Sequence, residues 1–104
     1  MEPPAYTLAR YRVKPGQEDA FVAAWNALAD SFGSLPAAPI WGALVRSQTE
    51  PEVYYSFGPW RSDADIKAMR SDPRARDAFA RISEHCVEMA PGDFDLVRRV
   101  VVEA

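Results

Sequence analysis

The sequence is poor in the residues that bind metals and form disulfides. It contains one cysteine, Cys86, and one histidine, His85. A single cysteine cannot form a disulfide within the chain, and a single imidazole cannot build the ligand sets of zinc or non-haem iron sites. We therefore expect no metal site. We interpret Cys86 as a core thiol, because the sequence shows no basic partner that would lower its pKa.

Long apolar runs and concentrated basic charge are also absent. No signal peptide or membrane-spanning stretch is recognisable, and the segment from Glu2 to Pro4 is polar and stiff. The formal charge is −3, with 12 basic residues spread through the chain. Nucleic acids and anionic lipids require clustered positive charge, so we expect neither nucleic acid nor a membrane as a partner. With the lone cysteine, these features favour a cytoplasmic protein.

The common catalytic motifs are missing as well. The sequence has no glycine-rich phosphate loop, no Ser-His-Asp set and no spaced acidic pair suited to two-metal or glycosidase chemistry. Because metal ligands are lacking too, we expect the protein to use no cofactor.

The chain does contain a strand followed by an amphipathic helix. The run from Ala5 to Val13 reads as a strand, and Pro15-Gly16 ends it. A helix from about Glu18 to Phe32 follows, and Gly33 is expected to end it as a left-handed cap. Spacings of four, three and four residues place its large apolar side chains on one face. These are Phe21, Trp25, Leu28 and Phe32.

The middle of the chain predicts a hairpin and a short helix. Ile40 to Arg46 and Val53 to Phe57 are rich in β-branched and aromatic residues and are separated by a polar segment. Gly58 to Trp60 closes the second of these strands. Ser62 or Asp63 can then cap a short helix that reaches Met69.

A second long helix and a last strand complete the pattern. Pro73 is expected to begin the helix, with Asp72 as its cap, and the helix continues to about Val87. Pro91-Gly92 is then expected to break the chain before a strand from Phe94 to Val102. The buried face of this helix is predicted to hold Ala75, Phe79, Ile82 and Cys86.

The resulting order, βαββαβ, predicts an α+β fold of the ferredoxin-like type. In this plan residues 1–104 form a single domain with a four-stranded antiparallel sheet and helices on one face. Alternate residues of a strand point to opposite faces of the sheet, and both sets contain large apolar residues here. The helix-free face would therefore expose an apolar patch. We expect a symmetric homodimer to cover that face, with a monomer as the alternative.

Several short motifs follow one another along the chain. They are Val13 to Gly16 with the helix after it, Ala38 to Ile40 leading into Leu44 to Ser47, and Trp60 to Ser62 followed by Asp72-Pro73 and Phe79. In these features the chain resembles the antibiotic biosynthesis monooxygenase family. The resemblance implies a dimeric α+β barrel with a cavity between the helices and the sheet of each subunit. Some members oxygenate polycyclic phenols without metal or flavin, and others cleave haem.

The pattern of the cofactor-independent oxygenases carries over in part. There an Asn lies four residues before the Trp that ends the third strand, and here Ser56 lies four residues before Trp60. A Tyr six residues beyond that Trp would fall at Ile66, and an Arg of the following helix near Phe79. Two of the four groups are therefore replaced by apolar residues.

The pattern of the haem degraders does not carry over. Their Asn on the first strand, their Trp after the third strand and their His on the last helix fall at about Thr7, Met69 and Phe79. Without an imidazole at the last position the iron would lack its axial ligand, so we expect no haem.

These considerations give a set of candidate site residues. Trp60 and Ser56 are the candidate catalytic residues, because an indole stacks on planar rings and a hydroxyl bonds a phenol oxygen. Packing in the core is the equal alternative for Trp60. Tyr11 and Tyr54 are candidate ligand contacts, and for both of them and for Ser56 a purely structural place in the sheet is the alternative.

Two further residues complete the set of candidates. Phe79 is a candidate ligand contact in the cavity, and His85 could accept a proton at the cavity rim or simply end its helix. The function that we expect is a cofactor-independent monooxygenase acting on a small phenol-like or hydroquinone-like aromatic substrate. The alternative is a non-catalytic ligand-binding or interaction barrel of the same fold.

Overall fold

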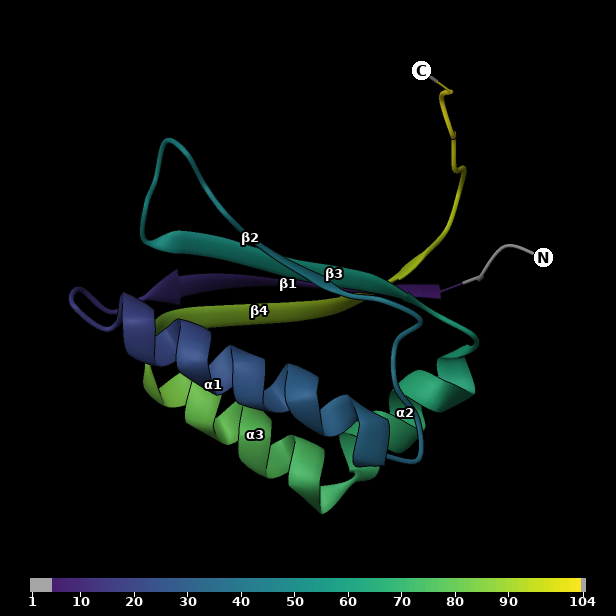
Figure 1. The fold of residues 1–104 in the computed structure, drawn as a ribbon, viewed down its shortest axis with the longest axis horizontal. Helices are drawn as coiled ribbons and strands as arrows, with labels where there is room; N and C mark the ends of the chain where they lie inside the picture. Colours follow the sequence, from purple (N-terminus) through teal and green to yellow (C-terminus); the bar gives the residue numbers. More distant parts are fainter. Residues whose placement is uncertain (1–4, 104) are drawn as a thin grey trace.

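The computed structural model describes residues 5–103. In chain order the elements are β1 (Ala5–Val13), α1 (Glu18–Ser31), the 3₁₀ helix η1 (Phe32–Ser34), β2 (Ala43–Arg46), β3 (Val53–Trp60), α2 (Asp63–Ser71), α3 (Pro73–Glu84) and β4 (Cys86–Asp95). The four strands form an antiparallel sheet in the order β2-β3-β1-β4, and the helices lie against one face of it (Figure 1). The predicted ferredoxin-like α+β fold is confirmed.

Local sequence signals set the beginnings of the helices. The turn from β1 into α1 uses Gly16 with a φ of 81°, a conformation that glycine adopts without steric cost. Ser62 caps α2 by accepting a hydrogen bond from the backbone N–H of Asp65 at 3.1 Å. Asp72 caps α3 by accepting from the N–H of Arg74 at 2.9 Å, and Pro73 occupies the first turn.

The end of α1 differs from the prediction of a left-handed cap at Gly33. Among the described residues, Gly16 alone has a positive φ, and α1 runs directly into η1. The serine hydroxyls explain why no left-handed residue is needed. Ser31 donates to the carbonyl oxygen of Leu28 at 2.6 Å, and Ser34 donates to that of Ser31 at 2.8 Å. Carbonyls of the last turn are thereby bonded without a left-handed cap.

β2 begins three residues later than the expected strand from Ile40 to Arg46. Before Ala43 the chain crosses over β3 instead of pairing with it along its length, and the N–H of Ile40 bonds the carbonyl oxygen of Pro59 at 2.8 Å. This crossing requires a glycine beneath it. A Cβ atom on Gly58 would lie 2.2 Å from the carbonyl oxygen of Trp41.

The last strand was predicted in the wrong place. β4 covers Cys86–Asp95, so Pro91-Gly92 lies inside the strand, and the segment expected as a strand from Phe94 to Val102 mostly follows it. β4 is an edge strand, where a proline is tolerated because one side of the strand makes no ladder bonds. Its earlier start ends α3 at Glu84 and moves Cys86 from the helix face into the sheet, opposite Val13.

The core beneath the sheet consists of two clusters. One is built around Tyr11, Phe21 and Ile82, and the other around Trp60 and Ile66. Phe32 and Phe79 pack against both clusters. The predicted apolar faces of the two long helices are therefore present, and the boundary between the clusters crosses the middle of the sheet.

Candidate active site

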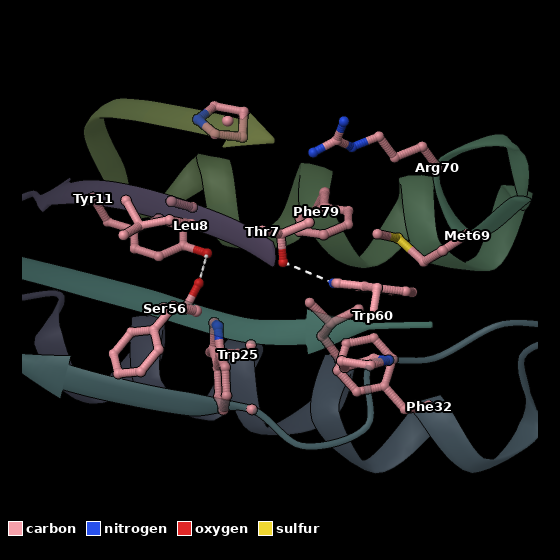
Figure 2. Close-up of a pocket in the computed structure, with 18 residues that line it drawn as sticks. Thr7, Leu8, Tyr11, Trp25, Phe32, Ser56, Trp60, Met69, Arg70 and Phe79 are labelled. Carbon is pink, nitrogen blue, oxygen red and sulfur yellow. Dashed lines mark hydrogen bonds between the residues drawn. The ribbon is translucent and has the colours of Figure 1, made fainter. Parts of the chain in front are cut away.

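A pocket lies where the two core clusters meet, between the sheet and the helices (Figure 2). It holds about 70 Å³ of free space. Small side chains at the centre of the sheet leave this space. In the ladder between β1 and β3, Thr7 is opposite Gly58 and Ala9 is opposite Ser56, and all four line the pocket.

Tyr11 and Ser56 form a hydroxyl pair in the pocket wall. The two oxygen atoms are 2.7 Å apart, and either can donate. The Tyr11 side chain is 1% exposed, and this burial raises the pKa of its phenol, while hydrogen bonds with Ser56 and Trp25 act in the opposite direction. Tyr11 is therefore neutral at physiological pH and can give a hydrogen bond without carrying charge.

Trp60 forms one end of the pocket. Its side chain is 2% exposed, and its indole Nε1–H donates to the hydroxyl of Thr7 at 2.9 Å. Thr7 thus fixes the orientation of the ring, and Figure 2 shows this contact beside Met69 and Phe32. The indole face is the part of Trp60 that remains for stacking on a planar ligand.

Arg70 is the charged residue of the lining. It comes from α2, and its guanidinium extends over the pocket near Phe79 (Figure 2). Nη1 of Arg70 donates to Oδ2 of Asp93 on β4 at 2.7 Å, and Nη2 contacts the other carboxylate oxygen. The Arg70 side chain is 40% exposed, so the pocket reaches solvent beside this ion pair.

The structure brings together four of the six residues singled out from the sequence. Trp60, Ser56, Tyr11 and Phe79 all line the pocket. The other two lie elsewhere.

Tyr54 packs against Phe21 with ring centroids 4.8 Å apart, and the guanidinium of Arg46 lies 5.3 Å from its ring. His85 follows α3 as its C-terminal cap, and its Nδ1 is 3.0 Å from the side-chain oxygen of Gln17. Neither Tyr54 nor His85 lines the pocket.

Sequence reasoning did not assign most of the lining to the site, including Thr7, Trp25 and Arg70. Thr7 had a detectable signal, because the alternation of β1 places it on the same face as Ala9 and Tyr11. Trp25 was assigned only to the helix face. Arg70 gave no signal, because its position depends on how α2 packs and on the register of β4.

Metal ligands do not gather in the part of the chain that the structure describes. Residues 5–103 contain no group of three or more His, Cys, Asp or Glu side chains that could hold a metal ion. Within the same residues, no helix has the length and apolar character needed to cross a membrane.

Solved structures of low sequence identity share this fold. SnoaB, a cofactor-independent oxygenase from Streptomyces nogalater, has a TM-score of 0.82 and 16% identity, with 97% of this chain and 99% of that chain covered. A protein from Caulobacter crescentus CB15 that carries the name antibiotic biosynthesis monooxygenase has a TM-score of 0.80 and 19% identity over 93% and 92% of the two chains. A protein of the same name from Chloroflexus aurantiacus J-10-fl has a TM-score of 0.73 and 23% identity, with 95% of this chain and 99% of that chain covered. At these identities the likeness concerns the fold.

The sequence itself identifies the family. None of the curated proteins matches the chain. The family model described as antibiotic biosynthesis monooxygenase, however, matches residues 4–81, which include β1 to β3, α1, α2 and most of α3. The chain belongs to the antibiotic biosynthesis monooxygenase family.

Proposed function

We propose that the protein is a monooxygenase that acts on a small planar phenol or hydroquinone without a metal or an organic cofactor. The observation that carries the proposal is the pocket itself. It is lined mainly by aromatic and small apolar side chains, with a neutral hydroxyl pair and the indole rings of Trp25 and Trp60. Family membership and the cofactor-independent oxygenase among the structural relatives support the same reaction class.

The substrate supplies the electrons in this proposal. A phenol that has given its proton to water transfers one electron to dioxygen, the two radicals join to form a carbon–oxygen bond, and the peroxide takes a proton back from water. At a methylene between two rings the resulting peroxide then loses water. Two C–H bonds are broken, one C=O bond is formed, and the second oxygen atom leaves as water. The protein's task is to orient the ring and to exclude bulk water.

The pocket residues fit this task. The indole face of Trp60 would stack on the ring, and the Tyr11–Ser56 pair would donate a hydrogen bond to a substrate or peroxide oxygen. The pocket must first widen, because an apolar cavity that binds benzene has a volume of about 150 Å³. The side chains that can move to make this space are only partly buried. They are Trp25, Phe32 and Phe79.

The proposal includes a homodimer in the cytoplasm. The helix-free face of the sheet carries apolar side chains that a second copy would cover, and Cys86 is a buried free thiol of the kind that reducing compartments preserve.

A ligand-binding barrel without catalysis is the second candidate. The observation that favours it is that the polar groups of the pocket already satisfy one another. Tyr11 bonds Ser56, and Trp60 bonds Thr7. A ligand that broke these bonds would have to replace them, which lowers the net gain of each new contact.

Oxygen uptake distinguishes the two candidates. We would measure uptake with anthrones, hydroquinones and flavonoid-like phenols, for the native protein and for Ser56→Ala. Loss of one positioning hydrogen bond should slow turnover by about tenfold or more. Ser83→Ala is the matched control, because Ser83 is exposed on α3.

A second variant tests the pocket as the site. Ala9→Val would fill part of the space, and valine suits a strand, so the fold should persist while turnover falls. Uptake no faster than autoxidation across the panel would favour the binding barrel. Equal rates for the native protein and both pocket variants would place the site elsewhere.

A further inference from the structure

Arg70 brings a positive charge to a lining that is otherwise uncharged. Within residues 5–103 it is the only charged side chain that lines the pocket, and the other polar lining groups are hydroxyls and the indole N–H groups of Trp25 and Trp60. The hydroxyl of Ser56 is paired with that of Tyr11, and the hydroxyl of Thr7 accepts from Trp60. Arg70 is thus the group with which the pocket can recognise charge in a ligand.

Asp93 does not line the pocket but a neighbouring recess, from which it binds Arg70. Its two carboxylate oxygens contact the two terminal nitrogens of Arg70, in the fork-to-fork arrangement that guanidinium and carboxylate groups prefer. This geometry suits a carboxylate, with its two oxygen atoms in one plane, better than a single phenolate oxygen. Asp93 is therefore an internal stand-in for the acidic group of a ligand.

The ion pair can exchange its carboxylate at low cost. The side chains of Arg70 and Asp93 are 40% and 48% exposed, and ion pairs in contact with solvent contribute little to stability. After the exchange the Asp93 carboxylate would remain in contact with water, because its side chain is already 48% exposed. The incoming carboxylate would bind the same guanidinium while the attached ring entered the apolar pocket.

We propose that the pocket selects planar aromatic acids, and that the ligand carboxylate binds Arg70 in place of Asp93. This inference rests on the proposed function to the extent that both require the pocket to be the ligand site. It adds the substrate class and names Arg70 as the residue that determines specificity.

Binding measurements test the inference without any turnover. We would titrate the full-length protein by calorimetry with 2-naphthoate and with 2-naphthamide, which are nearly equal in shape and differ in charge. The native protein should bind the naphthoate more tightly. Arg70→Met keeps most of the apolar stem, and it should weaken naphthoate binding by about tenfold or more while leaving naphthamide unchanged.

Asp93→Asn should increase the affinity for naphthoate, and a misfolded variant would not bind more tightly. With the competing carboxylate neutralised, naphthoate should bind about two- to fivefold more tightly than to the native protein. Thermal melting of each variant checks the fold. Ala9→Val should weaken both probes, which ties the binding to this pocket.

The outcomes separate the inference from the proposed function. Equal binding of the two probes, unaffected by Arg70→Met, overturns the role of Arg70 and leaves the pocket as a ligand site. Weaker naphthoate binding by Asp93→Asn also overturns it. Failure of the native protein to bind either probe overturns the inference, and the oxygen-uptake experiment decides the proposed function separately.

Discussion

Tyr11 couples the site to the stability of the fold. Its phenol is buried and bonded to Ser56, and burial raises its pKa above the usual value of about 10. The folded state therefore holds the Tyr11 proton more tightly than the unfolded state does. The stability that follows from this difference is fully present below the unfolded pKa, and it is lost as the pH rises through the folded pKa.

We predict that Tyr11→Phe changes the response of the protein to alkaline pH. Near neutral pH the variant should lose about 1 kcal/mol of unfolding free energy, because the Ser56 hydroxyl loses its partner. Above about pH 10 the difference in unfolding free energy between the native protein and the variant should become smaller. The native protein loses the contribution of the neutral phenol there, and the variant has no such contribution to lose. Urea unfolding at a series of pH values measures both effects.

Tyr6→Phe is the matched control for this prediction. Tyr6 is only partly buried, and the register places it on the opposite face of the sheet from Tyr11. If Tyr6→Phe removed as much of the alkaline sensitivity as Tyr11→Phe, the role assigned to the buried phenol would be wrong.

At the scale of the elements, the crossing of the chain over β3 depends on Gly58. We predict that Gly58→Ala lowers the unfolding free energy by about 1 to 3 kcal/mol, the usual cost of overpacking. The added Cβ would lie 2.2 Å from the carbonyl oxygen of Trp41 and 3.2 Å from Cα of Gly42, and neither backbone atom can rotate away. Chemical denaturation measures the loss.

Gly33→Ala is the control for the substitution at Gly58. A Cβ on Gly33 would meet no heavy atom within 4 Å, and the φ of Gly33 is not positive. The same change in composition should therefore leave stability unchanged or raise it slightly, through the lower entropy of the unfolded chain. A similar loss in both variants would show that the close approach to Trp41 is unimportant.

Elements whose limits are set by local chemistry were predictable from the sequence. β1, the start of α1 and the caps at Ser62 and Asp72 follow from alternation, from turn residues and from side chains that bond the backbone. β4 was not predictable in this way. Pro91-Gly92 reads as a break, and only the position of the strand at the sheet edge explains why the strand continues through it.

The candidate site also contains residues that could be predicted from the sequence and residues that could not. The family resemblance pointed to Trp60 and Ser56, and the structure brings both to one pocket with Tyr11 and Phe79. The Arg70–Asp93 pair could not be predicted, because it joins α2 to a strand that was expected to begin at Phe94 and begins at Cys86. Contacts between elements distant in the sequence depend on the tertiary register, and local patterns do not carry that information.

At the scale of the whole molecule, the helix-free face of the sheet is the main unexplained surface. Residues directly opposite one another in the ladders lie on the same face, so the register groups Leu8 with Phe57, and Tyr6 with Phe94. Leu8 is 37% exposed and Phe94 is 51% exposed. Together with Val45 on β2, these residues form an apolar region of the kind that soluble proteins usually cover.

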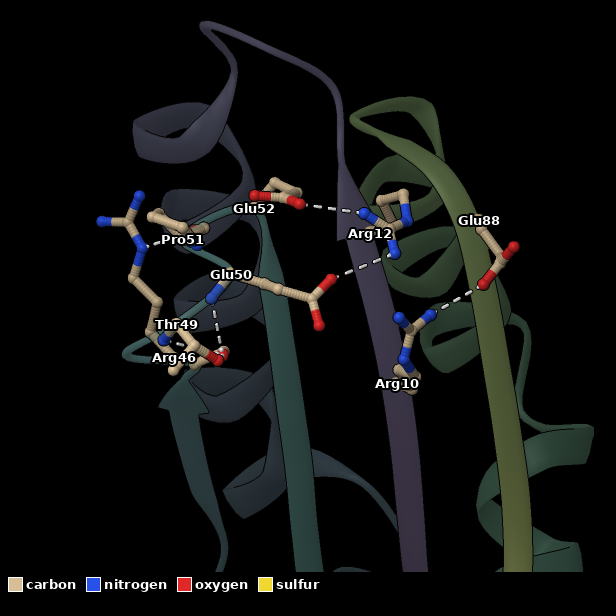
Figure 3. A network of polar contacts seen from close by, with 9 residues as sticks. Arg10, Arg12, Arg46, Thr49, Glu50, Pro51, Glu52 and Glu88 are labelled. Carbon is tan, nitrogen blue, oxygen red and sulfur yellow. Dashed lines mark hydrogen bonds and ion pairs between the residues drawn. The ribbon is translucent and has the colours of Figure 1, made fainter.

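The charges on the same face are already paired within the chain (Figure 3). Arg10 contacts Glu88 at 2.8 Å, and Arg12 contacts Glu52 at 2.9 Å and Glu50 at 3.5 Å. Covering an unpaired charge would be costly, whereas covering a paired one costs much less. The face is therefore suited to contact with a second copy, across both its apolar and its charged part.

We predict that the protein is a homodimer that pairs these faces, and that Val45→Glu shifts it toward the monomer. Val45 is 44% exposed and lies opposite Tyr55 on the helix-free face. In a dimer its substitution would place an unpaired carboxylate between two sheets, and in a monomer the same carboxylate would remain in water. Light scattering coupled to size exclusion at micromolar concentration should give twice the chain mass for the native protein and a lower mass for the variant. Ala80→Glu adds the same charge at an exposed position of α3 and should leave the mass unchanged. A monomeric native protein, or equal masses for all three proteins, would contradict the prediction and would mean that the apolar face remains in solvent.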